Sequence, residues 1–202
     1  MFSITESIET PHIYQLLTNG VVPRPIAWVS TISKTGIANL APYSFFSVAS
    51  VNPPVLTVTT VPARNKLAKD TLQNILDTQE AVVHIVTSEL AESMNASSGN
   101  FSSDTSEIDA LMLKTVASEL VTPPSIAATK IRYECTLREL IEVEPDPGGG
   151  MLIMLNVLGV YVDDSILDGN KIDPAKTTIL GKLGGNDYSD TAVKTVLLRP
   201  DG

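Results

Sequence analysis

The sequence predicts a mainly β protein with a few helices, and three observations carry this expectation. The stretch from Ile26 to Ile32 is rich in β-branched and aromatic residues and lacks helical spacing. The chain from Lys130 to Glu144 alternates apolar and polar residues. A partner run from Met151 to Val162 follows it across a loop rich in proline and glycine, as in a hairpin.

In chain order, the first predicted element is a short helix from Pro11 to Leu17, because proline is tolerated in the first helical turn. The strand at 26–32 ends at the turn Lys34-Thr35-Gly36, where glycine can adopt positive φ. Pro53-Pro54 then breaks the chain before another strand at 55–60.

Between that turn and that break lies an apolar run from Ile37 to Val48. Asn39, Pro42 and Ser44 interrupt it where a plain core strand would carry valine or isoleucine. These positions place polar atoms at the turns between strands. Trp28, Phe45 and Phe46 could offer packing surface to a ligand, although aromatic residues in strands more often belong to the core.

The next stretch is rich in hydrogen-bond donors and leads into a predicted helix. Apolar residues at helical spacing follow Lys69-Asp70-Thr71, so Asp70 or Thr71 is expected to cap a helix. A helix N-terminus with Arg64 and Lys69 beside it suits a phosphate group. The segment alone leaves a phosphate site and an ordinary solvated cap both open.

Further along, a strand is expected at 80–86 and a helix at 89–95, followed by an exposed polar loop at 97–106 that could cover a ligand site. His84, in the strand, is expected to be half-buried with its hydrogen bonds satisfied. A second helix is expected at 107–113. Its inward-facing residues should be Ile108, Leu111 and Met112.

Composition excludes several classes of function. The net charge of −9 and the pI near 4.6 argue against binding to nucleic acid or to an anionic membrane. Cys135 is the single cysteine, so no intrachain disulfide exists and a reducing compartment is expected. The absence of a signal-peptide pattern after Met1 predicts a cytoplasmic protein. No motif for hydrolysis, metal binding or a Rossmann domain is present, and no metal site is predicted.

Four motifs in a fixed order resemble the flavin reductase-like family, which includes flavoredoxins and the reductase components of two-component monooxygenases. They are RPIAWVST at 24–31, NLAPYSFF at 39–46, NPPVL at 52–56 and KDT at 69–71. The segment from Gly181 to Tyr188 is also similar, with Lys182 where the family often has arginine. The resemblance covers about 21–200 of a single domain expected over 1–202.

The resemblance implies an FMN-binding split β-barrel, a six-stranded Greek-key barrel with flanking helices. It implies non-covalent FMN, NADH or NADPH as electron donor, and a homodimer whose interface completes the flavin pocket. By the same resemblance, the expected cofactor-binding residues are Arg24, Ser30, Thr31, Asn39, Leu40, Ala41, Ser44, Phe45, Arg64, Lys69, Asp70 and Thr71.

Three functions follow from this resemblance. The first is an NAD(P)H-dependent flavin reductase that passes electrons to free flavin, an oxygenase partner or another acceptor. The second is a flavoredoxin-like electron carrier reduced by a redox-protein partner, and the third is a non-catalytic flavin-binding module. The protein supplies binding and orientation in each case, and no residue is predicted to be catalytic, because the flavin carries the redox chemistry.

Overall fold

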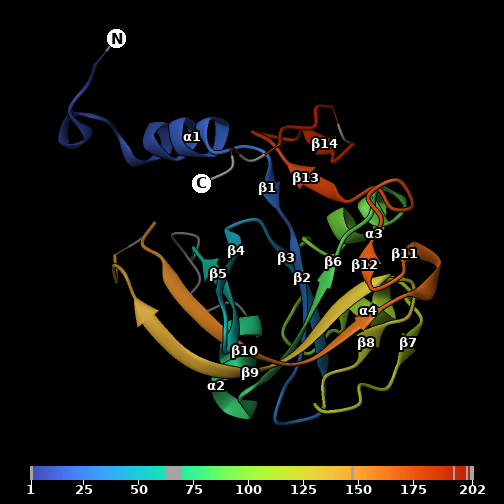
Figure 1. Ribbon diagram of the computed structural model, residues 1–202. Coiled ribbons are helices and arrows are strands. Elements are labelled where there is room, and N and C mark those ends of the chain that lie inside the picture. The colour runs from blue at the N-terminus through green and yellow to red at the C-terminus, as the bar shows by residue number, and fades with distance from the viewer. Residues whose placement is uncertain (1, 62–69, 147, 193, 199, 201–202) are drawn as a thin grey trace.

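The computed structural model describes residues 2–61, 70–146, 148–192, 194–198 and 200 (Figure 1). Its helices are α1 (Thr10–Gly20), α2 (Asp70–Thr78), α3 (Ala91–Ala96) and α4 (Glu107–Ala110), with 3₁₀ turns η1 (Thr5–Ser7), η2 (Ser88–Leu90) and η3 (Asp164–Ile166). Its strands are β1 (Arg24–Pro25), β2 (Ala27–Ile32), β3 (Ala38–Tyr43), β4 (Phe46–Val51), β5 (Pro54–Thr60), β6 (Glu80–Ile85), β7 (Thr115–Val116), β8 (Ser125–Ile126), β9 (Ile131–Glu142), β10 (Met151–Val162), β11 (Leu167–Asp168), β12 (Lys171–Ile172), β13 (Leu180–Lys182) and β14 (Tyr188–Asp190).

An antiparallel sheet of seven strands organises the fold, in the order β3-β2-β6-β9-β10-β5-β4. This confirms the mainly β prediction. The run predicted at 37–48 divides into β3 and β4, which are consecutive in the chain yet form the two edges of the sheet. Only Ser44 and Phe45 join them, so the sheet curls toward a barrel, and the long β9–β10 hairpin follows this curve (Figure 1).

Side chains on the two faces of β2 pack into two separate hydrophobic clusters, because successive side chains of a strand point to opposite faces of the sheet. Ala27 and Val29 pack in one cluster with residues of β5, β6, β10 and α2. Ile26, next to the strand, and Trp28 pack in the other with residues of β3, α3 and α4. The core therefore holds α2 on one face of the sheet and α3 and α4 on the other.

Two predicted elements differ in length. The helix expected at 107–113 ends at Ala110, and Met112 has φ 52° and is 88% exposed, so it does not face the core. The first helix continues to Gly20, beyond the predicted Leu17. None of the helices in the described ranges is long and apolar enough to span a membrane.

The alternation predicted for β9 breaks at Glu134, which is buried instead of facing solvent. Its two carboxylate oxygens accept the backbone N–H groups of Glu119 (3.0 Å) and Leu120 (2.6 Å). These bonds compensate the burial of its charge and fix the chain that crosses this face. Cys135, its neighbour, is fully buried as predicted, and burial raises the pKa of its thiol to about 12.

His84 is fully buried, not half-buried, and both ring nitrogens are satisfied as predicted. Nε2 accepts the N–H of Ile126 at 3.0 Å, so Nδ1 carries the proton and donates to the carbonyl of Trp28 at 2.8 Å. Burial lowers the pKa of His84 from 6.5 to about 4. The ring is therefore neutral at pH 7, and its role here is structural.

Protonation of His84 should destabilise the fold between pH 6.5 and pH 4. Because the folded pKa lies below the unfolded value, the stabilisation is complete above pH 6.5 and is lost as the pH falls through this window. The loss should be on the order of 3 kcal/mol in the free energy of unfolding. Urea titrations at several pH values measure it. His84→Gln should be less stable at pH 7 but should show a flatter pH dependence, and equal slopes would contradict the assignment.

Candidate functional site

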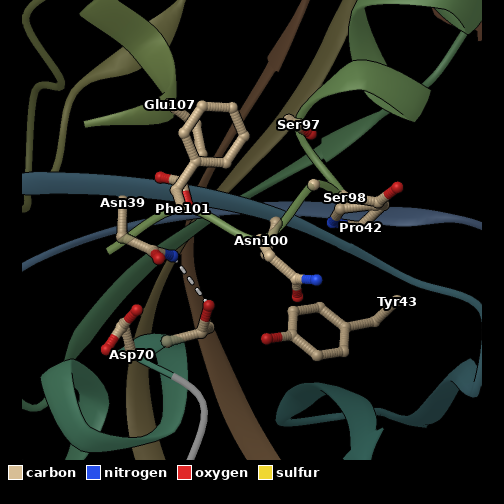
Figure 2. Close-up of a pocket in the computed structure, with 12 residues that line it drawn as sticks. Asn39, Pro42, Tyr43, Asp70, Ser97, Ser98, Asn100, Phe101 and Glu107 are labelled. Carbon is tan, nitrogen blue, oxygen red and sulfur yellow. Dashed lines mark hydrogen bonds between the residues drawn. The ribbon is translucent and has the colours of Figure 1, made fainter. Parts of the chain in front are cut away.

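A polar pocket of about 200 Å³ lies where β3, the start of α2 and the loop after α3 meet (Figure 2). Figure 2 shows the Tyr43 hydroxyl and the Asn100 side chain pointing into the space between these elements. The lining residues are Asn39, Ala41, Pro42, Tyr43, Asp70, Thr71, Ser97, Ser98, Gly99, Asn100, Phe101 and Glu107.

The pocket is built on the outer edge of β3, which pairs only with β2 in the sheet. The Leu40 N–H points away from β2 and donates to Glu107 Oε2 at 2.9 Å. Residues two apart in a strand face the same edge, so Pro42 occupies the next outward position, where a missing N–H leaves no donor unpaired. The carboxylate and the proline thus satisfy this edge without another strand.

Side-chain hydrogen bonds connect β3 to α2. Asn39 Nδ2 donates to Thr71 Oγ1 at 2.8 Å, and both side chains are buried. Burial raises the pKa of Tyr43 far above its usual value, as do the charges of Glu107 and Asp70, while a hydrogen bond with Thr71 acts in the opposite direction. The Tyr43 hydroxyl therefore keeps its proton at physiological pH, so it can act as a hydrogen-bond donor.

Four predicted binding residues line this pocket together: Asn39, Ala41, Asp70 and Thr71. Asp70 and Thr71 are the first two residues of α2 within the described part of the chain. The predicted phosphate site also involves Arg64 and Lys69, which lie outside the described residues.

Two other predicted residues, on β2, are fully buried and already bonded to the protein. Ser30 Oγ donates to the Pro124 carbonyl at 2.6 Å, and Thr31 Oγ1 accepts from Asn74 Nδ2 at 3.1 Å. Neither lines the pocket. Thr31 instead connects the sheet to α2, which carries Thr71.

Arg24 holds several segments together by its guanidinium group. It donates to the carbonyls of Thr18, Val21 (2.9 Å) and Leu183 (2.8 Å), which lie at the end of α1 and after β13. Its Nε donates to Ser44 Oγ at 3.3 Å, in the short connection between β3 and β4. These contacts give Arg24 and Ser44 a structural role outside the pocket. Leu40 and Phe45, also predicted, do not line it either.

Sequence reasoning predicted that the loop at 97–106 could cover a ligand site, and residues 97–101 line the pocket, but it did not predict Glu107 as a lining residue. The polar composition of that loop indicated exposure and a possible cover, but no local signal identified Phe101 as its pocket-facing aromatic residue. Glu107 carries no motif at all. Glu107 lies at the pocket because α4 packs beside β3, and these two segments are far apart in sequence.

Two further aromatic residues, Tyr161 and Tyr188, do not line this pocket. Arg132 Cζ lies 3.6 Å from the ring centroid of Tyr161. The two residues are cross-strand partners in the β9–β10 hairpin. Lys182 Nζ lies 4.1 Å from the Tyr188 ring centroid, and Tyr188 donates to Asn95 Oδ1 at 3.3 Å. The second cluster ties β13 and β14 to α3, whose end carries the pocket loop.

Comparison with known proteins identifies the family. A family model described as the flavin reductase like domain matches residues 19–174. The chain belongs to the flavin reductase-like family. A relative from Aquifex aeolicus, itself uncharacterised, is 38% identical over 177 residues, which cover 87% of this chain and 88% of the relative. Family membership makes the protein a flavin-related oxidoreductase.

Solved structures agree with this assignment. Nitrilotriacetate monooxygenase component B from Bacillus cereus superposes with a TM-score of 0.92 at 28% identity, covering 98% of each chain. A split-barrel protein from Shewanella frigidimarina superposes with a TM-score of 0.82 at 20% identity, covering 99% of each chain. The second likeness concerns the fold alone, and it confirms the predicted split barrel.

Loss of the Glu107 carboxylate should destabilise the pocket edge. Glu107→Ala leaves the buried Leu40 N–H without its acceptor, which costs about 2 kcal/mol in the free energy of unfolding. Glu107→Gln keeps an acceptor oxygen and should lose less than half of that. Denaturant titration measures both variants. Asp109→Ala, an exposed acid on the same helix, is the control, and equal losses in all three variants would contradict this role.

Proposed function

We propose that the protein is an FMN-dependent oxidoreductase reduced by NADH or NADPH. One observation carries the proposal: the pocket on the β3 edge unites the NLAPYSFF and KDT motifs through the Asn39–Thr71 hydrogen bond. Segments far apart in sequence that share a polar pocket are expected at a ligand site. Family membership supplies the chemistry of the ligand.

The donors and acceptors of the pocket fit a flavin. The pyrimidine edge of isoalloxazine needs both, and the polar side chains of Asn39, Tyr43 and Thr71 line the pocket. Phe101 and Pro42 supply apolar surface for the ring system. Thr71 and Asp70 begin α2, so the helix N-terminus is available to the phosphate, with Lys69 and Arg64 as its expected cations.

The size of the cavity supports a second contributor to the site. Small-molecule sites commonly span roughly 300–1,000 Å³, whereas this pocket measures about 200 Å³. It therefore suits part of a flavin. We attribute the rest of the enclosure to a second copy of the chain.

The surface also supports a homodimer. No charged residue lies between Lys34 and Arg64, and on the edge strand β4 within that stretch Val48 and Val51 are 64% and 85% exposed. An exposed apolar edge strand without charge invites pairing. Because each copy carries a net charge of −9, a charge-free surface is where two copies can approach with least repulsion.

Bound FMN would accept a hydride from the nicotinamide ring and pass electrons to an acceptor. The residues around it need only bind, orient and exclude water, since this hydride transfer requires no general acid or base. The likeness to a monooxygenase component favours free flavin or an oxygenase partner as acceptor. A flavoredoxin-like carrier and a non-catalytic flavin module are the alternatives that the next experiment separates.

The purified protein should show a flavin absorbance spectrum, or acquire one with added FMN, and the spectrum should bleach on anaerobic addition of NADH or NADPH. The faster donor identifies the preferred nicotinamide. A spectrum that stays oxidised with both donors would favour the carrier or the module. Failure to take up FMN at all would overturn the proposed function.

The dimer should dissociate when charge is placed on β4. Val48→Lys combined with Val51→Lys puts two cations on the exposed edge, so light scattering after size exclusion should detect a monomer that binds FMN at least tenfold more weakly. Val116→Lys, an exposed valine on β7, is the matched control and should leave the dimer intact. A β4 variant that remains dimeric would rule out this interface.

A further inference from the structure

The single tryptophan of the chain is bonded to the pocket loop. Trp28 is fully buried, and its Nε1–H donates to Ser97 Oγ at 2.9 Å. Ser97 Oγ in turn donates to the Met94 carbonyl at 2.7 Å, so its proton and one of its lone pairs are both used. The indole therefore fixes the residue at which α3 ends and the loop at 97–101 begins.

Trp28 is itself held by the neutral His84. The carbonyl of Trp28 accepts the proton of His84 Nδ1, and the two rings meet edge to face at 6.5 Å between centroids. His84 Nε2 accepts from Ile126 in β8. A continuous chain of buried hydrogen bonds thus runs from β8 through β6 and β2 to the pocket loop.

The remaining hydrogen bonds of the loop are local. Backbone N–H groups of Ser98, Gly99 and Phe101 donate to carbonyls within three residues, and the Ser98 hydroxyl donates to Asn95. The hydrogen bond from Trp28 joins this loop to the sheet. The Trp28–Ser97 bond is therefore a buried anchor for the loop that carries Asn100 and Phe101 in the pocket wall.

We propose that Trp28 and Ser97 are positioning residues whose hydrogen bond preorganises the loop at 97–101 as one wall of the flavin pocket. The proposal rests on the proposed function for the identity of the ligand. A wall that is ordered before binding spares the ligand the entropy of ordering it, which raises affinity. Neither residue needs to touch the flavin for this effect.

The test is a double-mutant cycle on FMN affinity. Ser97→Ala and Trp28→Phe each delete one partner of the bond and should each weaken FMN binding about fivefold, the size expected for one buried hydrogen bond. The double variant should bind no more than twofold more weakly than Ser97→Ala alone, because both changes remove the Trp28–Ser97 bond and only Ser97→Ala also removes the bond to the Met94 carbonyl. Flavin fluorescence measures all four dissociation constants.

Ser118→Ala is the matched control, because its hydroxyl also bridges a turn by donating to a carbonyl, that of Pro123, away from the pocket. It should leave FMN affinity within twofold of the native value. Trp28→Phe also shrinks a buried side chain, so its result counts only if the variant folds. Ser97→Ala removes a single oxygen and keeps the test decisive in either case.

Amide hydrogen exchange without flavin gives an independent measure. Residues 97–101 should exchange at least fivefold faster in Ser97→Ala than in the native protein, while β9 and β10 stay unchanged. Unaltered exchange and unaltered FMN affinity in this variant would overturn the proposal. If the native protein takes up no FMN, the proposed function fails, and the exchange rates still decide whether Trp28 and Ser97 position the loop.

Discussion

The outer edge of β3 is the constraint on which the rest of the site depends. An edge strand carries backbone groups that must be bonded or solvated, and an exposed apolar edge invites aggregation. Here Glu107 accepts the outward N–H of Leu40, and Pro42 has no N–H to satisfy. Because a side chain and a proline protect the edge instead of a neighbouring strand, space remains beside it. That space is the pocket.

Sequence reasoning located the strands of the seven-stranded sheet because they are coded locally, although it treated β3 and β4 as one run and did not predict the short strands β1, β7, β8 and β11–β14. The sequence of β9 alternates apolar and polar residues over much of its length, and the turns carry proline or glycine where the backbone needs them, as at Gly36 with φ 87°. The reasoning was wrong about the helix at 107–113, since apolar spacing alone placed Met112 in the core. The positive φ of Met112 is incompatible with a helix at this position, and no residue pattern predicted this backbone conformation.

The candidate site was only partly predictable for a related reason. Asn39 stood out because it interrupts an apolar run and Thr71 because it stands where a helix is predicted to begin, and a hydrogen bond joins the two side chains. Arg24 was expected at the site from the resemblance alone, and its guanidinium donates to the carbonyls of Thr18, Val21 and Leu183. Residue type does not distinguish an arginine that binds backbone from one that binds a ligand. The role of Glu107 could not be predicted, because its hydrogen-bond partner, Leu40, is far away in sequence.

The two-residue connection between β3 and β4 has a mechanical consequence. It joins opposite edges of the sheet, and a chain of this length spans only about 11 Å between Tyr43 and Phe46. Arg24 Nε donates a hydrogen bond to Ser44 Oγ in this connection, which further restricts its movement. Because the connection is short and bonded, β4 cannot move far without moving β3. The edge strand β4 and the pocket strand β3 are therefore mechanically coupled through Ser44 and Arg24.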